Sequence, residues 1–330
     1  MHKQSSMADM EYSNRKRKTK RDEFLETMEE IIPWGEVVSL IEPYYPSGRR
    51  GRPPIGIEKM LRMYLLTIWF SLSDEGVEDA IYDSYAFRNF LGVDFLGKEQ
   101  VPDATTLCNF RKLLHEKGIA QAIFESLKVF LDAHGKMMHG GTIVDATIIE
   151  APTSTKNAEG KRDEEMHSVK KGNEWHFGER LHVAVDAGTG FIHGCEVTAA
   201  NVNERDVVLQ LVRQDDEVVY GDAGYCGIEK RDEIRDDPHF SQIDWRINVQ
   251  KPYRKNEWLS GPGIYWHRLF EYQKSRVRSK VEYVFLVIKR IFHYRKVRYR
   301  GLARNRTHAY MLCACTNLFL LAQAGWGGAD

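Results

Sequence analysis

One stretch decides the fold: Thr142-Ile143-Val144-Asp145-Ala146-Thr147-Ile148-Ile149, a mostly β-branched run that follows two glycines. Because β-branched side chains favour strands, we predict a strand here. The run contains a single acidic residue, Asp145, between Val144 and Ala146. An ionised carboxylate in an apolar strand is costly unless it is paired or bound to a metal. The stretch therefore predicts both a sheet and a functional site within it.

The chain that follows this strand alternates between strand and helix patterns. A polar loop is expected at residues 152–174. The sequence Ala187-Gly188-Thr189-Gly190 predicts a hairpin turn. The order favours an α/β domain with a mixed sheet and helices, compatible with an RNase H-like layer. We expect further strands at 181–186, 191–197, 217–220 and 243–249, and helices at 204–213, 274–292 and 309–322.

The chain that precedes the strand has helical periodicity throughout. We expect helices at 24–42 (broken by Pro33), 58–72, 84–91, 104–116 and 120–134. A further helix is expected to begin after Ser73, which can cap it, and a basic loop is expected at 49–54. Arg111 and Lys112 would project from the helix at 104–116. Short helices joined by tight turns fit either a helix-turn-helix-like DNA-binding module or a plain helical bundle. The predicted organisation is a basic mobile arm (1–22), an all-helical DNA-binding domain (23–135) and a catalytic domain (136–326).

The composition is that of a soluble globular protein. The 330 residues are 42% apolar and 28% charged, which excludes a mostly disordered chain. Five scattered cysteines favour a reducing, cytoplasmic setting over a disulfide scaffold. The most apolar stretch, 309–322, falls short of the roughly 20 residues that a membrane span needs. We therefore expect no membrane partner.

A net charge of zero conceals a strong local asymmetry. Residues 251–306 contain 16 Lys and Arg against three Glu, a local charge of +13. Two smaller basic clusters lie at 15–21 and at Arg49, Arg50 and Arg52. Any one cluster could be a solvated charged surface. Binding to phosphate groups depends on the local charge and not on the net charge of the chain, so three basic clusters favour binding to a polyanion.

Two further carboxylates stand in apolar surroundings like that of Asp145. Asp222 follows the strand expected at 217–220, and Glu282 lies in a helix of apolar and basic residues. If the three meet, a divalent metal would offset their repulsion, and Mg²⁺ prefers such oxygen ligands. Arg278 lies four residues before Glu282 and Lys289 seven after it, so all three would share one helix face. The alternative is an ordinary surface ion pair between Arg278 and Glu282.

Four stretches together resemble a known family. They are residues 142–152, residues 171–178 (Lys-Gly-Asn-Glu-Trp-His-Phe-Gly), Asp222-Ala223-Gly224-Tyr225-Cys226-Gly227, and Arg278-x₃-Glu282-x₆-Lys289. They resemble DDE transposases of the insertion-sequence family five, within the IS-four/IS-five superfamily, and most closely the founding subgroup. The resemblance runs from about residue 24 through the C-terminal helix. One position departs from the signature: Ser275 stands where the family has a tyrosine, and Tyr272 lies one turn earlier.

The resemblance implies a fold, an activity and a set of site residues. The fold is an RNase H-like catalytic domain preceded by a helical DNA-binding domain. The activity is metal-dependent cleavage at element ends and transfer of the 3′-hydroxyl into target DNA, with two Mg²⁺ or Mn²⁺ ions held by catalytic Asp145, Asp222 and Glu282. Arg278 and Lys289 would hold the phosphate backbone.

The resemblance also implies partners and a location. The partner is double-stranded DNA, at terminal inverted repeats and at the target, bound by a homo-oligomer in the cytoplasm and nucleoid of a bacterium or archaeon. Trp175 and His176 either contact end DNA or are packed aromatics at a hairpin. Two other activities stay open: an inactivated or domesticated DNA-binding regulator, and a nuclease without strand transfer.

Overall fold

The computed structural model describes residues 16–48, 53–94, 99–158, 160–249 and 262–325. The chain divides into two compact units, Met1–Ser126 with Leu318–Asp330, and Leu127–Asn317. The sequence placed the boundary at 135/136 and assigned the C-terminal helix wholly to the catalytic domain. The two compact units divide inside the helix that contains residue 126 and inside the last helix, and the domain bounds given by the sequence stay a prediction. No helix in the described ranges is both long and apolar enough to cross a membrane.

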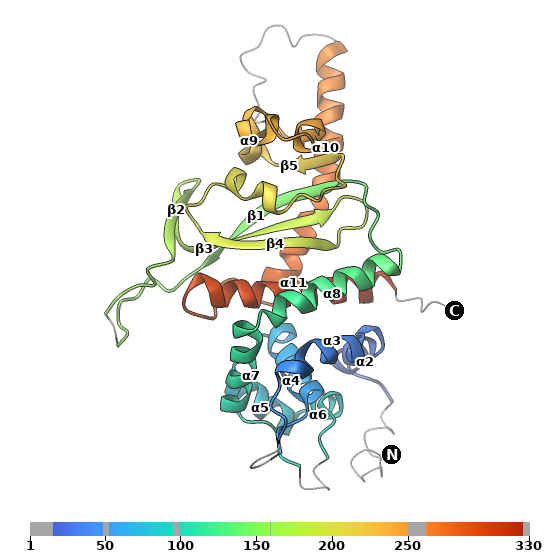
Figure 1. Cartoon of the computed structure of the whole chain (residues 1–330), viewed down its shortest axis with the longest axis vertical. Helices are drawn as coiled ribbons and strands as arrows, with labels where there is room; N and C mark the ends of the chain where they lie inside the picture. The colour runs from blue at the N-terminus through green and yellow to red at the C-terminus, as the bar shows by residue number, and fades with distance from the viewer. Residues whose placement is uncertain (1–15, 49–52, 95–98, 159, 250–261, 326–330) are drawn as a thin grey trace. The chain divides into compact units, whose positions relative to one another are not determined.

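The N-terminal unit is helical, as predicted (Figure 1). Its helices are α2 (Lys20–Ile31), α3 (Trp34–Ile41), α4 (Ile57–Trp69), α5 (Asp74–Asp83), α6 (Tyr85–Leu91), α7 (Ala104–Glu116) and the start of α8 (Ile119–Ala133), with a 3₁₀ turn at Glu42–Tyr44. Pro33 separates α2 from α3, as expected. The expected arm at 1–22 extends too far, because α2 begins at Lys20.

Side-chain caps explain where these helices begin. Thr19 and Asp22 form a reciprocal capping box at the start of α2. Ser73 accepts a hydrogen bond of 3.0 Å from the Gly76 amide, and Asp103 accepts one of 2.6 Å from the Thr106 amide. Each cap satisfies an amide that the helix itself leaves unbonded. Ser73 begins a helix where the sequence predicts one, and Asp103 directly precedes the helix predicted at 104–116.

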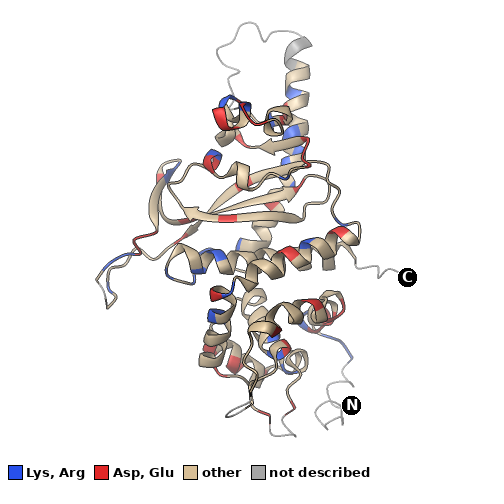
Figure 2. Ribbon diagram, in the orientation of Figure 1, with Lys and Arg blue, Asp and Glu red and all other residues tan. Residues whose placement is uncertain are grey.

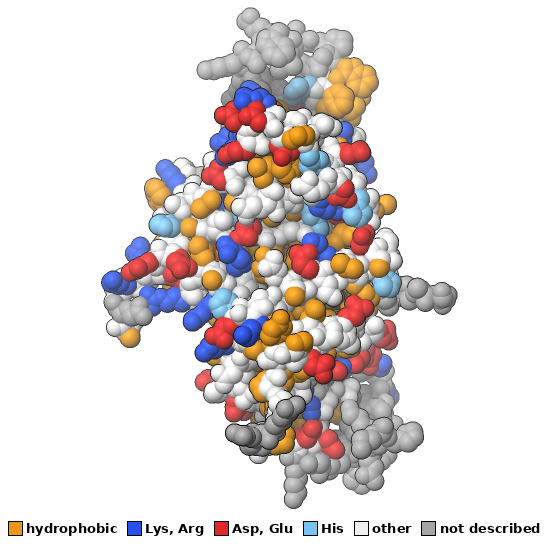
Figure 3. Space-filling model, viewed as in Figure 1, with side chains coloured by type: hydrophobic (Ala, Val, Ile, Leu, Met, Phe, Trp, Pro, Cys, Tyr) orange, Lys and Arg blue, Asp and Glu red, His pale blue; other side chains and the backbone are white. Residues whose placement is uncertain are grey.

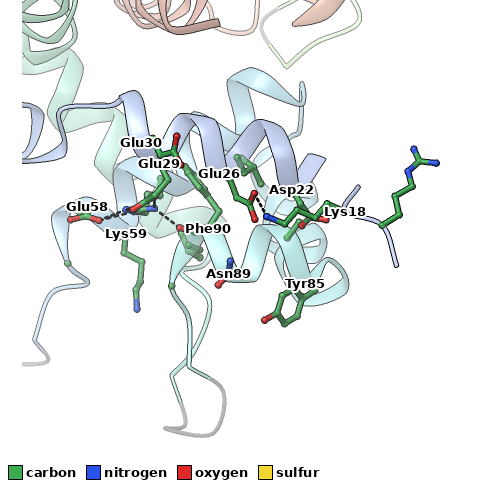
Figure 4. A pocket seen from close by; sticks show the side chains of 17 residues that line it. Lys18, Asp22, Glu26, Glu29, Glu30, Glu58, Lys59, Tyr85, Asn89 and Phe90 are labelled. Carbon is green, nitrogen blue, oxygen red and sulfur yellow. Dashed lines mark hydrogen bonds and ion pairs between the residues drawn. The ribbon is translucent and has the colours of Figure 1, made fainter. Parts of the chain in front are cut away.

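A cavity of about 960 Å³ opens on this unit, lined mainly by α2, α4 and α6 (Figure 4). Acidic and basic side chains face each other there, as in the 2.7 Å ion pair between Lys18 and Glu26. The buried Arg62 binds Glu29, Glu58 at 2.8 Å and the Phe90 carbonyl at 2.8 Å. These pairs connect the three helices, so we assign the charges of the cavity a structural role.

The second unit is built on a six-stranded mixed sheet. Strand β3 pairs antiparallel with β1, and β2 and β4 both pair antiparallel with β3; β5 is parallel to β1, and β6 is parallel to β5. This is the α/β class with a mixed sheet that the sequence predicts. The strands are β1 (Thr142–Glu150), β2 (His167–Lys171), β3 (Glu174–Asp186), β4 (Ile192–Ala199), β5 (Val218–Gly221) and β6 (Asp244–Ile247).

Two segments of this unit differ from the prediction. Strand β2 lies inside the expected loop at 152–174, because it is an edge strand whose exposed residues lack an apolar alternation. The helix expected at 204–213 is instead two 3₁₀ turns, Glu204–Asp206 and Val208–Gln210. There Val207, Val208 and Leu211 enter the core under the sheet together with Val144 and Val219. Packing against the sheet thus overrides helical periodicity.

Helix α10 (Pro262–Leu286) packs against β1 and β5. Val281 and Val284 of this helix are buried, and the chain continues into one π-helical turn at Val287–Ile291. Helix α11 (Leu302–Ala324) follows, and its Asn317 side chain bonds both the amide and the carbonyl of Ile192 at 2.8 Å. Asn317 therefore pairs the backbone of edge strand β4, which explains a polar residue in an apolar helix.

Candidate active site

Two aspartates occupy matched positions on adjacent parallel strands. The register of β1 with β5 pairs Thr142 with Val219 and Ile143 with Tyr220. Two residues further on, the same register brings Asp145 opposite Asp222, the first residue after β5. Neighbouring parallel strands lie about 4.8 Å apart, and residues that stand opposite each other in the register point their side chains to the same face of the sheet. The fold therefore brings together two carboxylates that are 77 residues apart in sequence.

Asp145 lies largely buried between the sheet and α10. Its side chain is 14% exposed, and its Oδ2 forms an ion pair with Arg278 Nη1 at 2.8 Å. Its Oδ1 accepts a hydrogen bond of 2.8 Å from the Ala146 amide. Burial raises the pKa of Asp145 to about 6. The Ala146 hydrogen bond and Arg278 oppose this shift, whereas the nearby Asp222 and Glu204 carboxylates add to it.

Glu282 joins the site through the same guanidinium. Arg278 Nη2 lies 3.2 Å from Glu282 Oε1, while its Nη1 is bound to Asp145. The Glu282 side chain is 64% exposed and lies one helical turn after Arg278 on α10. The pair is therefore more than the ordinary surface ion pair of the alternative reading, because its arginine also reaches the sheet.

A fourth carboxylate, Glu204, was missed by the sequence analysis. Its Oε1 pairs with Arg180 Nη1 at 2.9 Å, and the side chain is 20% exposed. A Cβ atom placed on Gly224 would lie 2.9 Å from both Glu204 Oε2 and Asp222 Oδ1, so the two carboxylates converge beside this glycine. The sequence predicts a helix at 204–213, and a glutamate at the start of such a helix gives no sign of lying near Asp222; the residue lies instead in a 3₁₀ turn.

Comparison with known protein families decides the assignment. The family model for the transposase DDE domain matches residues 136–318, more than half of the chain. The chain belongs to the DDE transposase family. A second model, the transposase domain DUF772, matches residues 13–113. The cryo-EM structure of the piggyBac transposase synaptic complex with hairpin DNA is similar at 10% sequence identity and a TM-score of 0.45, over 92% of this chain and 74% of that chain.

The transposase is thus an enzyme that acts on DNA, with a helical region before its DDE domain. Members of the family generally use divalent metal ions. The donor set here fits such an ion in chemistry, since it offers only carboxylate oxygens, the ligands that Mg²⁺ prefers. Within the described ranges, however, no three Asp, Glu, His or Cys side chains are gathered around one point. Glu282 is 64% exposed and is connected to Asp145 through Arg278.

Lys289 of the transposase lies in the π-helical turn, and its Nζ donates a 2.8 Å bond to the Ile148 carbonyl of β1. Burial lowers the pKa of this lysine, and Lys171 adds to the effect. The sequence placed Lys289 on one α-helical face with Arg278 and Glu282. The π turn changes that spacing, because it adds a residue per turn.

The hairpin of β2 and β3 carries two residues expected to contact DNA. Trp175 is 70% exposed at the start of β3, so it is not the packed aromatic of the alternative reading. His176 Nδ1 lies 3.3 Å from Glu150 Oε1 at the end of β1. The exposed indole is available for stacking, while His176 already has an acidic neighbour.

The other predicted DNA-contacting residues of the transposase differ in their surroundings. Arg111 is 13% exposed and forms a bidentate pair with Asp74, so it joins α7 to α5. Lys112 is 66% exposed, with Glu116 at 3.7 Å. Arg49, Arg50 and Arg52 lie outside the described residues.

Basic side chains recur along helix α10. Figure 2 shows Lys and Arg, in blue, at several points along α10. The face drawn in Figure 3 carries acidic and basic side chains intermixed. This agrees with a net charge of zero and a local charge of +13 at residues 251–306.

Proposed function

We propose that this transposase cleaves DNA at the ends of an insertion sequence and joins the resulting 3′-hydroxyl to target DNA. The observation that supports it best is the matched register of Asp145 and Asp222, with Arg278 linking Asp145 to Glu282. We further propose that the enzyme is most similar to insertion-sequence family five. The motifs at 142–152, 171–178, 222–227 and 278–289 support that finer placement.

Asp145, Asp222 and Glu282 would hold two divalent ions, Mg²⁺ or Mn²⁺. When bound, such ions neutralise the carboxylates and activate and stabilise the oxygens that attack and leave phosphorus. The buried Asp145 is the ligand whose charge costs most without a cation, because desolvation disfavours its ionised form. Its β1 position fixes it on a rigid strand, whereas Glu282 on the surface of α10 is free to adjust.

The reaction needs two in-line attacks at phosphorus. Water first attacks the phosphodiester at the element end, and the 3′-oxygen leaves as a hydroxyl. That 3′-hydroxyl then attacks a target phosphodiester, whose own 3′-oxygen leaves as a hydroxyl, so that the element end is joined to the 5′-phosphate of the target. No covalent protein intermediate forms. In both steps Arg278 orients Asp145 and Glu282, and its positive charge offsets charge that develops on the phosphoryl oxygens. Lys289, held against β1, adds positive charge beside the same strand.

DNA binding would use the basic segment at 251–306, with Trp175 and Lys112 as exposed contacts. Two element ends must be brought together for strand transfer, so we propose that the active species is a homo-oligomer on double-stranded DNA. Such a substrate would place the enzyme at the nucleoid of a bacterial or archaeal cell.

A strand-transfer assay tests this function. The full chain is incubated with Mg²⁺ or Mn²⁺, a labelled DNA fragment that ends in the inverted repeat flanking the coding region, and a supercoiled target. The proposal predicts nicked ends and joined products. Nicking without joining would indicate a nuclease, and binding without nicking would indicate an inactive regulator; either result would overturn the proposal.

A further inference from the structure

The position of Glu204 is fixed by packing between two short turns. Its 3₁₀ turn, Glu204–Asp206, contacts the turn Ala223–Tyr225 that directly follows Asp222. Arg205 Nη1 donates a 3.1 Å bond to the Cys226 carbonyl, and Arg231 Nη1 pairs with Asp206 at 2.6 Å. These bonds of the two residues that follow Glu204 hold its backbone beside Asp222.

The two oxygens of Glu204 have different surroundings. Oε1 is held by Arg180 Nη1 of β3 at 2.9 Å. In the part of the chain that the structure describes, Oε2 carries no hydrogen bond. It faces the same point beside Gly224 as Asp222 Oδ1, which accepts a 2.8 Å hydrogen bond from the Gly224 amide. A Cβ on Gly224 would lie 2.9 Å from each oxygen, closer than real Cβ contacts allow. Glycine at this position therefore leaves room for both carboxylates to converge.

We propose that Glu204 is a fourth carboxylate of the active site and that its Oε2 helps to hold the divalent cation bound by Asp145 and Asp222. This inference rests on the proposed function. Arg180 anchors Oε1, so little side-chain freedom is lost when Oε2 takes a cation. The strand register adds that Asp145 stands opposite Asp222. The three carboxylates are not gathered around one point in the described part of the chain, so a bound cation would have to draw them together.

The other role open to Glu204 is purely structural, as the partner of Arg180. The chain offers a matched control for that role. Glu196 on β4 is 17% exposed, close to the 20% of Glu204, and it pairs with Arg306 at 2.6 Å. A glutamine at either position keeps the shape and one acceptor oxygen but removes the charge. The two variants therefore differ in their position relative to Asp145 and Asp222, and not in burial or partner type.

Binding of Mn²⁺ to the full chain, followed by the electron paramagnetic resonance signal of free Mn²⁺, separates the two roles. We expect Glu204→Gln to weaken Mn²⁺ affinity by about tenfold or more, and Glu196→Gln to change it less than about twofold. Thermal unfolding in EDTA verifies that each variant is folded. Wild-type Mn²⁺ affinity in folded Glu204→Gln, or equal loss in both variants, would overturn the inference.

A second variant keeps the inference testable if Glu204→Gln does not fold. Gly224→Ala leaves all carboxylates in place but inserts a methyl group where Glu204 and Asp222 converge, and should also weaken Mn²⁺ binding. Asp145→Asn separates this inference from the proposed function. If Asp145→Asn loses Mn²⁺ binding and Glu204→Gln does not, only the role of Glu204 fails. If Asp145→Asn keeps both Mn²⁺ binding and nicking, the proposed function fails.

Discussion

Asp145 on β1 and Arg278 on α10, 133 residues apart in sequence, form an ion pair with 2.8 Å between Oδ2 and Nη1. The second guanidinium nitrogen of Arg278 holds Glu282. One planar side chain thus links the sheet carboxylate to the helix carboxylate, and a planar fork suits two acceptors at once. The relative position of α10 and β1 is therefore part of the site.

Replacing Arg278 with lysine tests that link. Lysine keeps the charge but is a point donor, so it does not hold both carboxylates in one plane. We expect Arg278→Lys to lower the nicking rate about 10- to 100-fold, the usual cost of losing a residue that orients metal ligands, with end binding little changed. The exposed neighbour Arg276 is the control, and Arg276→Lys should stay within about twofold. Similar rates for both variants would speak against the orienting role.

Arg111 and Lys112 are adjacent on α7 but should behave differently. Arg111 is largely buried with Asp74, so Arg111→Gln should lower the free energy of unfolding by about 1–3 kcal/mol. Lys112 is exposed, so Lys112→Gln should leave stability within about 0.5 kcal/mol and weaken DNA binding. Urea unfolding and a salt-dependent DNA-binding titration measure the two effects. Unchanged stability in Arg111→Gln would be the wrong result for a structural pair.

Asn317 should stabilise the edge of the sheet. Asn317→Leu leaves the Ile192 amide and carbonyl without their partner, at a cost of about 1–3 kcal/mol for buried polar groups. Thr316 is equally buried, but its hydroxyl bonds the Leu312 carbonyl of its own helix, so Thr316→Val is the control with a smaller effect. Urea unfolding of both variants makes the comparison. A larger loss in Thr316→Val than in Asn317→Leu would refute this role.

Glu179 should make the stability of the fold depend on pH. Burial raises the pKa of Glu179 to about 8, against the opposing hydrogen bond from Tyr294 at 3.1 Å. The folded state binds the Glu179 proton more tightly than the unfolded state does. The contribution of Glu179 to the free energy of unfolding is therefore fully present below about pH 4.5 and is lost as the pH rises through about 8. Thermal unfolding of wild type and of Glu179→Gln from pH 5 to 8 should show this fall as a difference between the two proteins, on the order of a few kcal/mol, because the buried His182 and His193, with lowered pKa values, act in the opposite direction in both.

The variant Glu179→Gln removes the titrating group, so its stability should fall less over the same pH range. Glu229→Gln, at an exposed glutamate, is the control and should follow the wild-type curve. Parallel curves for wild type and Glu179→Gln would show that another group causes the pH dependence.

The sequence predicted the fold well where local patterns decide it. The β-branched run of β1, the glycine turn before β4 and the cap Ser73 all act within a few residues. It failed where tertiary packing decides. Residues 204–213 have helical spacing, but contact with the core under β1 and β5 gives two 3₁₀ turns, and no local signal marks β2.

The same distinction applies to the site. Asp145 and Asp222 could be chosen from sequence because each stands alone beside an apolar strand. Glu204 could not, since its proximity to Asp222 depends on two turns packing through Arg205 and Arg231. Nor could the pairing of Arg111 with Asp74, which joins residues 37 positions apart. Long-range ion pairs are visible only once the fold is known.

The most direct measurement of the central claim is nicking of a labelled element-end fragment by Asp145→Asn. The substitution keeps the size and shape of the side chain and removes the charge that would bind a cation. We expect specific end binding to stay within about threefold of wild type, since base and phosphate contacts lie elsewhere, and Mg²⁺-dependent nicking to disappear. Nicking that persists in Asp145→Asn with Mg²⁺ would contradict the account.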